Sequence, residues 1–247
     1  PSTDAPETVK NEDDFNSQLS ALDSDLHTFI GKYPGAIGNS LQVQMCPASD
    51  SSTNSAFDAW AYKDNFDAAP GNSSFATKKT ATDDEVHVAV IDKNGQFTGT
   101  NGTVLETYPF MSVAKNARNE DGTSNYVKDV INERSEYVWM VDFDSDFRQA
   151  GAGTNMADSG SNFNITTAAT GATKPASQIK TFNFASGADV SSLTTGNILS
   201  GFDLFEDKDQ VEIDFLIAPS MASRSDTTTV VNDLVTTCLL YTSDAAD

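Results

Sequence analysis

The sequence predicts an α/β fold, in which a mixed sheet is flanked by helices and interrupted by polar loop or β insertions. Apolar segments typical of strands occur at residues 86–91 and 137–141, with an amphipathic helix predicted between them at 126–131. A second helix, at 195–205, is followed by another apolar segment at 211–219. Such alternation of helix and apolar strand is typical of α/β layers. The polar insertions favour a competing class, a β-rich surface protein, whose circular dichroism spectrum would show almost no helix.

The chain is strongly acidic. It has 247 residues, 38% of them hydrophobic, and a formal net charge of -21, so it is long enough to bury a substantial core. Nucleic-acid affinity rests on neutralising phosphates with Lys and Arg, so no nucleic-acid partner is predicted. Solubility is the simplest explanation of the acidity. No apolar run approaches the roughly 20 residues needed to cross a bilayer, so no membrane partner is predicted either.

Three segments are predicted along the chain. Residues 1–30 form an acidic N-terminal segment and helix, and residues 31–237 form one α/β core domain with insertions at about 47–84 and 142–180. Residues 238–247 match the translation of a transposase-type sequencing adapter, so we expect the protein's own sequence to stop before them. The chain is then a fragment that lacks terminal arms, and we expect it not to assemble into regular tubes when expressed alone.

The cysteine count follows from that expectation. Of the two cysteines, Cys238 lies in the adapter-like segment, which leaves Cys46. A single thiol cannot form an internal disulfide, and this suits a reducing cytoplasm better than secretion.

The N-terminal half begins with an amphipathic helix. Apolar residues spaced by threes and fours from Phe15 to Phe29 predict it, with Asp13 or Asp14 as its cap and Gly31 as its end. Alternating apolar residues at 41–46 then predict a half-buried strand. The excursion over 47–84 is polar but carries aromatic side chains that must bury against something. These are Phe57, Trp60, Tyr62, Phe66 and Phe75.

A hairpin is predicted at the centre of the chain. Strand 86–91 leads into a tight turn at Asp92–Gly95, where Asp, Asn and Gly suit a reversal of the backbone. A returning strand is expected from Gln96 toward Tyr108, bent near Gly99 and Gly102.

The C-terminal half contains a long polar insertion before its structural elements. Residues 142–178 are predicted to be a surface insertion with a short hairpin at about 163–167, followed by a return strand at 181–184. The segment at 211–219 becomes almost entirely apolar toward its end, which predicts a strand covered on both faces. A further helix is expected to begin at 230–235.

The sequence predicts no catalytic residue. The two histidines, His27 and His87, lie far apart without zinc-ligand spacing, and both are interpreted as packing residues. Ser124 follows a Gly-Thr pair that is similar to the surroundings of a subtilisin-type nucleophile, but His87 lacks the glycine-rich context of such proteases. We expect Thr123 or Ser124 to cap the following helix instead.

No cofactor or metal is predicted. Residues 142–146 begin like a calcium loop, but Phe147 occupies the position that requires glycine and Gly153 the position of the bidentate Glu. The glycines around Gly99 match no nucleotide-binding loop. Sequons of the glycosylation type are short enough to arise by chance, and they begin at Asn72, Asn101 and Asn164.

A series of short blocks, in a fixed order, carries a resemblance. They are 32–41 (KYPGAIGNSL), 85–92, Gly99, 102–106, 121–126, 129–132, 135–139, 202–205 and 211–219. This ordered series resembles the tail sheath proteins of contractile-tailed bacteriophages. The blocks are spread over most of residues 30–220, and the two insertions contribute least to the resemblance.

The resemblance implies a structural subunit rather than an enzyme. Sheath subunits form a helical homo-oligomer around the tail tube protein, meet baseplate and tail terminator proteins, belong to the virion tail and assemble in the host cytoplasm. Relatives described as subtilisin-like share that fold only, and no triad is carried over.

Two alternatives stay open. An acidic secreted or surface adhesin would be indicated by a neighbouring secretion cassette. A hydrolase using Ser124 and His87 would be labelled by a fluorophosphonate.

Overall fold

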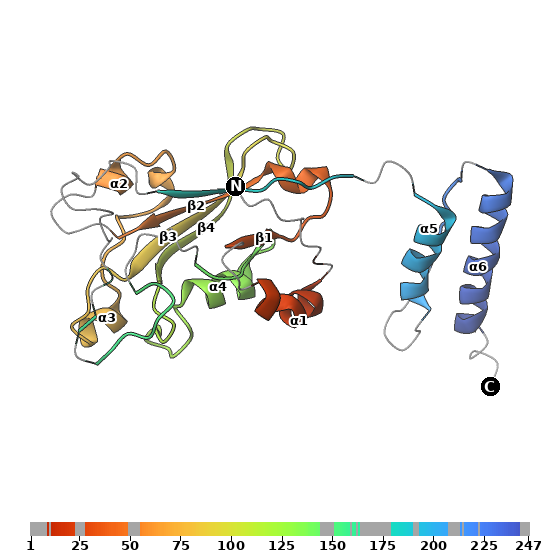
Figure 1. The fold of residues 1–247 in the computed structure, drawn as a ribbon. Helices are drawn as coiled ribbons and strands as arrows, with labels where there is room; N and C mark the ends of the chain where they lie inside the picture. The colour runs from red at the N-terminus through yellow and green to blue at the C-terminus, as the bar shows by residue number, and fades with distance from the viewer. Residues whose placement is uncertain are drawn as a thin grey trace. The chain divides into compact units, whose positions relative to one another are not determined.

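The chain forms two compact units, residues 1–189 and 190–247, and each is considered by itself. The computed structural model describes residues 9, 11–22, 28–48, 55–143, 151–158, 160, 161, 163, 179–189, 193–206, 213, 215–221 and 223–242. The structure contains helices beside its strands, as the α/β prediction requires and the β-rich alternative does not (Figure 1). The predicted hairpin at 163–167 lies outside the described residues except for Phe163, which is buried in the core.

The first unit contains a main sheet in the order β4-β3-β2-β6 and a small sheet of β1 and β5. The strands are β1 (Phe29–Gly31), β2 (Leu41–Pro47), β3 (Glu85–Asp92), β4 (Thr103–Ser112), β5 (Val138–Met140) and β6 (Lys180–Asn183). Every pairing among these strands is antiparallel. The mixed sheet expected from the sequence is therefore not seen among the described strands. Antiparallel neighbours do not need the crossover connection that joins parallel strands.

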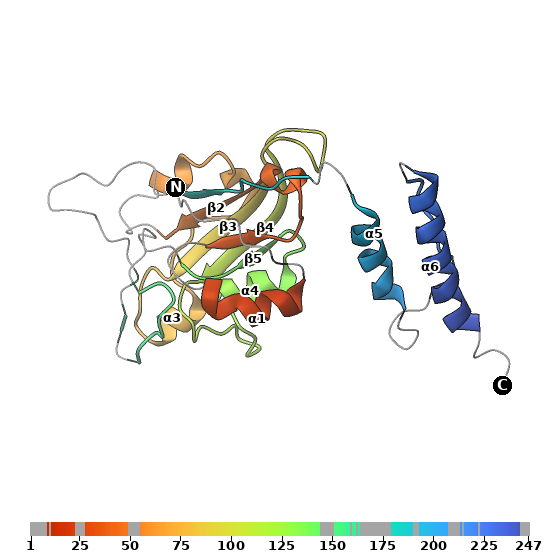
Figure 2. The same ribbon diagram turned by 45° about the vertical axis from the view of Figure 1, so that its right-hand side comes forward.

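Helices and short helical turns surround the two sheets. They are α1 (Glu12–Leu22), η1 (Ala36–Ser40), α2 (Ser55–Asp58), η2 (Lys63–Asn65), α3 (Ser74–Lys78) and α4 (Val127–Arg134). Figure 2 shows α1, α4 and β5 on one side of the main sheet. The strand predictions at 41–46, 86–91 and 181–184 and the helix prediction at 126–131 are confirmed.

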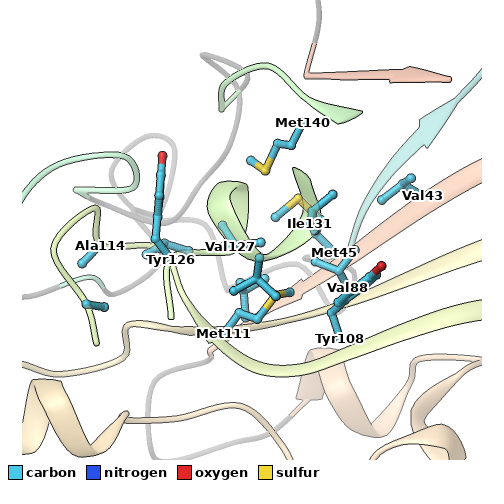
Figure 3. Close-up of a cluster of buried hydrophobic side chains, with 14 of the residues drawn as sticks. Val43, Met45, Val88, Tyr108, Met111, Ala114, Tyr126, Val127, Ile131 and Met140 are labelled. Carbon is cyan, nitrogen blue, oxygen red and sulfur yellow. The ribbon is translucent and has the colours of Figure 1, made fainter. Parts of the chain in front are cut away.

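One face of the main sheet carries the larger core. Alternation along β2 and β3 directs Val43, Met45 and Val88 to this face, where they meet Val127 and Ile131 of α4. Figure 3 shows these side chains converging with those of β4 and β5. In the register of these two strands Val43 lies opposite Val90 and Met45 opposite Val88, and a slip of one residue would turn every side chain of a strand to the other face.

The opposite face of the sheet is covered by the first polar insertion. Trp60 and Phe66 are buried against Cys46, Ala89 and Ile91. The Trp60 indole donates a hydrogen bond to Gln44 Oε1 at 2.7 Å, so the polar tip of the ring is satisfied as well. The prediction that the aromatic rings of this insertion bury is confirmed for these two. The insertion thus forms the second core of the sheet through Trp60 and Phe66, with Phe57 and Tyr62 packed against them.

The first helix is shorter than predicted. α1 ends at Leu22 among the described residues, and Phe29 belongs instead to β1, where it pairs with Met140 of β5. The Asn11 side chain, not Asp13 or Asp14, accepts the backbone N–H of Asp14 at 2.8 Å and caps the helix. Phe29 matches the helical spacing, but its ring is buried against another strand instead. It packs edge-on against Phe182 of β6, with 5.0 Å between ring centroids.

The returning strand predicted from Gln96 is wrong at its start, because β4 begins only at Thr103. Lys93 and Asn94 do form a turn, and Gly95 has the expected positive φ, 72°. The connection is a ten-residue loop organised around the buried Asp92 carboxylate. That group accepts hydrogen bonds from the Ser40 hydroxyl at 2.6 Å and from the N–H groups of Gln96, Phe97 and Thr98 at 3.0, 2.9 and 2.8 Å. A fifth bond comes from the Thr98 hydroxyl at 2.9 Å. Local turn statistics favoured a two-residue reversal, but these five donors stabilise a wider loop.

The second unit consists of α5 (Thr195–Phe202), η3 (Asp203–Phe205) and α6 (Arg224–Thr242). The helices predicted at 195–205 and from 230 are confirmed, and Thr194 forms a capping box with Asn197 at the start of α5. The strand predicted at 211–219 is wrong where the segment is described. Residues 213 and 215–219 are unpaired coil. An apolar run becomes a strand only where neighbouring strands take its backbone groups, and no described strand does so.

Replacement of Asp92 by Asn is expected to destabilise the first unit by about 3 kcal/mol, because an amide cannot accept five hydrogen bonds as a carboxylate does. Burial alone would raise the pKa of Asp92, but hydrogen bonds from Ser40, Thr98 and Phe97 lower it to about 2. The stabilisation is therefore complete above the unfolded-state pKa of about 4 and is lost as the pH falls toward 2. Urea unfolding between pH 2 and pH 7 measures both effects.

Asp121→Asn is the matched control for this prediction. The Asp121 carboxylate accepts from the N–H and hydroxyl of Thr123 in an exposed turn, so its loss should change stability little. Equal effects of Asp92→Asn and Asp121→Asn would contradict the organising role of Asp92.

Candidate functional site

His87 is the buried histidine of the first unit, and both of its ring nitrogens are bonded to the backbone. Its Nδ1 accepts the N–H of Phe110 at 3.0 Å, and its Nε2 therefore carries the proton and donates to the carbonyl of Ala68 at 2.8 Å. The ring stacks on Phe66 at 4.5 Å between centroids. Burial lowers the pKa of His87, although the bond to Ala68 opposes this. The imidazole is thus held neutral and joins the insertion to β4.

The geometry around His87 also explains a strained residue. The β3–β4 register shifts between Val86 and Val88, and Phe110 in that bulge has a φ of 53°. A bulky residue rarely adopts this left-handed conformation. The hydrogen bond to His87 and the edge-on ring contact at 4.6 Å hold it there. The interpretation of His87 as a packing residue fits this geometry, and His27 lies outside the described residues.

Ser124 is not brought together with His87. Its hydroxyl donates to Asp129 Oδ2 at 2.7 Å, while both nitrogens of His87 are occupied as described above. A serine nucleophile needs a base within hydrogen-bond reach. The expectation that Thr123 or Ser124 caps the helix is also wrong, since the N-cap of α4 is Tyr126 and its side chain forms no capping bond. Ser124 instead accepts the Tyr126 N–H at 3.3 Å.

Within the described part of the chain, no group of three or more His, Cys, Asp or Glu side chains could hold a metal ion. Asp142 of the calcium-loop-like segment is described, whereas residues 144–150 are not. Among the helices that the structure describes, none is long and apolar enough to cross a membrane. The sequon residue Asn164 likewise lies outside the described residues.

Two adjacent carboxyl groups at the start of β3 have different environments. Asp84 is fully buried and accepts the N–H and hydroxyl of Ser73, each at 2.8 Å, and the hydroxyl of Ser112. Glu85 accepts the Gly71 N–H at 2.8 Å. Burial raises the pKa of Glu85 to about 7, the Gly71 bond opposes the rise, and the charge of Asp84 adds to it. These bonds fasten residues 71–73 to the sheet. Neither residue was singled out by the sequence analysis, because a polar pair before a strand carries no distinctive pattern.

The surface of the molecule carries features that the sequence did not predict. In the second unit, Phe215 and Ile217 are 87% and 83% exposed, and Leu193, Leu204 and Val235 are also exposed. In the first unit, three aromatic rings from separate segments meet at the surface, those of Tyr33, Phe97 and Tyr137. Exposed apolar groups gathered in one region are typical of protein that packs against other protein. These two surfaces are therefore the candidate functional sites of this chain.

Comparison with known proteins gives one informative similarity. The chain matches no protein-family model. A stretch of 97 residues, 39% of this chain, is 32% identical to the tail sheath protein of Salmonella phage ViI. The match spans 12% of that protein's length. Part of this chain is thus related to part of a phage tail sheath protein.

Replacement of Glu85 by Gln is expected to stabilise the first unit at pH 8 by about 1 kcal/mol, after allowance for its partial exposure. The folded-state pKa of Glu85 lies above the unfolded value of 4.5. The folded chain therefore holds the proton more tightly, and stability falls as the pH rises from 4.5 toward 7. At pH 4 the variant and the parent chain should be equally stable. Urea unfolding of both at the two pH values, with exposed Glu133→Gln as control, measures this. A difference that is the same at pH 4 and pH 8 would refute the assignment.

Proposed function

We propose that this chain is a subunit of the contractile tail sheath of a bacteriophage. The observation that carries the proposal is the 32% identity over 97 residues to the tail sheath protein of Salmonella phage ViI. The ordered series of blocks between residues 32 and 219 supports the same assignment. In this role the protein is structural, and no catalytic residue, cofactor or metal is needed.

The proposed subunit assembles with copies of itself into a helical tube around the tail tube protein. Helical assembly requires contacts that join two different surfaces of the subunit and repeat without closing. The exposed side chains of Phe215 and Ile217 supply apolar surface of the kind that such contacts bury. Baseplate and tail terminator proteins are the partners proposed at the two ends of the tube. Nucleic acid and membrane are not partners in this proposal, in keeping with the net charge of -21.

Contraction is proposed to rearrange contacts between subunits while each core stays folded. A change of this kind needs elements that move as rigid bodies about an interface. The core of the first unit has the required features, since both faces of its main sheet are covered and buried polar groups such as Asp92 and His87 are bonded. The proposed core domain covers residues 31–237, with insertions at 47–84 and 142–180. Assembly would take place in the host cytoplasm, and the finished protein would lie in the virion tail.

Immunogold electron microscopy tests this function. Antibodies raised against this chain are expected to decorate phage particles from the source sample along the whole outer surface of the tail. In contracted particles the labelled length should shorten while the bare tube protrudes. Pre-immune serum is the control. Labelling confined to capsids, to tail fibres or to bacterial surfaces would overturn the proposal, and the last of these would favour the adhesin alternative.

A further inference from the structure

Three aromatic side chains form a continuous patch at the surface of the first unit. The ring of Tyr33 stacks on that of Tyr137 at 5.6 Å between centroids and meets Phe97 edge-on at 5.0 Å. Phe97 and Tyr137 are themselves edge-on at 5.5 Å. We call these three residues the aromatic patch. Each ring thus contacts both of the others, and together they present one π-surface.

The backbone holds the aromatic patch in place from three segments of the chain. The N–H of Lys32, next to Tyr33, donates to the carbonyl of Tyr137 at 2.8 Å and extends the β1–β5 pairing. The N–H of Phe97 donates to the Asp92 carboxylate at 2.9 Å. Rings fixed in this way lose little conformational freedom when they bind a ligand, which is one reason why aromatic residues serve as binding anchors.

The aromatic patch is open to solvent. Tyr33 is 38% exposed, and Phe97 and Tyr137 are partly buried. Neither tyrosine hydroxyl makes a hydrogen bond to another of the residues that the structure describes. A core residue of this size would normally satisfy its hydroxyl within the protein. Surface tyrosines whose hydroxyl groups make no hydrogen bond within the described protein are typical of protein interfaces, where tyrosine is enriched.

Carboxylates flank the aromatic patch. Burial raises the pKa of Tyr137, and the neighbouring Tyr33 and the charges of Glu106 and Glu136 raise it further. Glu106 is held in place by the Ser135 hydroxyl at 2.7 Å and the Glu136 N–H at 2.8 Å. The Glu136 side chain is exposed and forms no ion pair with a described residue.

The ammonium group of Lys32, the residue next to Tyr33, is already engaged. The ammonium of Lys32 donates to the carbonyl of Ser135 and lies 4.9 Å from the centre of the Trp139 ring. Lys32 therefore does not cover the exposed rings of the aromatic patch. Burial lowers the pKa of Lys32, and the charges of Glu12, Glu106 and Glu136 oppose this, so two carboxylates share this one ammonium beside the rings.

We propose that the aromatic patch and Glu136 bind an arginine or lysine side chain from a basic segment of a partner protein. A cation placed over the face of an aromatic ring is attracted by its quadrupole, and a nearby carboxylate adds a charge-assisted contact. A second copy of this chain is a poor source of the cation, because the sequence has 15 basic against 36 acidic residues. Charge complementarity favours a partner whose surface is basic. The inference goes beyond the proposed sheath function and does not depend on it.

The test is a titration of the whole chain, carrying ring-labelled ¹³C tyrosine, with a pentapeptide that holds one arginine. The same peptide with citrulline, the neutral isostere of arginine, is the control ligand. Tyr33→Phe and Tyr137→Phe assign the two patch signals among the six tyrosines of the chain. The arginine peptide is expected to shift these two signals saturably, and the citrulline peptide is not.

Variants separate the patch from general attraction to an acidic protein. Tyr33→Leu, which keeps an apolar side chain but removes the ring, and Glu136→Gln should each weaken arginine-peptide binding about fivefold. Tyr62→Leu and Glu120→Gln lie outside the patch and should leave the affinity unchanged. Glu136→Gln leaves the three rings in place, so its result does not depend on the folding of the Tyr33 variant. Equal shifts at every tyrosine, or unchanged affinity in both patch variants, would overturn the proposal.

Discussion

The buried carboxylate of Asp92 is the constraint on which much of the first unit depends. It stands at the end of β3, and its bonds reach Ser40, the last residue of η1 before β2, and three successive N–H groups of the loop that follows β3. A buried charge is costly unless donors surround it, so the loop must adopt the one path that supplies them. The same path sets the position of Phe97. The central hairpin, the entry to β2 and the aromatic patch thus share one anchor.

The main sheet of the first unit is also covered on both of its faces. α4 packs on one face, and the insertion between β2 and β3 packs on the other through Trp60 and Phe66. His87 fastens that insertion through Ala68. A unit built in this way can change its neighbours without changing its own fold, because close-packed cores are not continuously deformable. That property suits the proposed role as a sheath subunit.

The sequence predicted those parts of the fold that local pattern determines. Alternation placed the strand at 41–46 correctly, since both the pattern and the burial have a period of two. Local pattern failed where contacts between distant parts of the chain determine the secondary structure. Phe29 fits a helical face but pairs in a strand, and the apolar run at 211–219 lacks strand neighbours where it is described. For the candidate surface, single residues such as Tyr33 carry no signal, because the aromatic patch exists only once three distant segments meet.

Amide hydrogen exchange tests most directly whether Asp92 organises this loop. The N–H groups of Phe97 and Thr98 lie outside any strand, yet both are bonded to the Asp92 carboxylate. We expect them to exchange as slowly as the paired amides in the middle of β3, because only opening of the core would release them. Exchange of these two amides as fast as that of an exposed loop residue such as Glu120 would show that the carboxylate does not hold the loop.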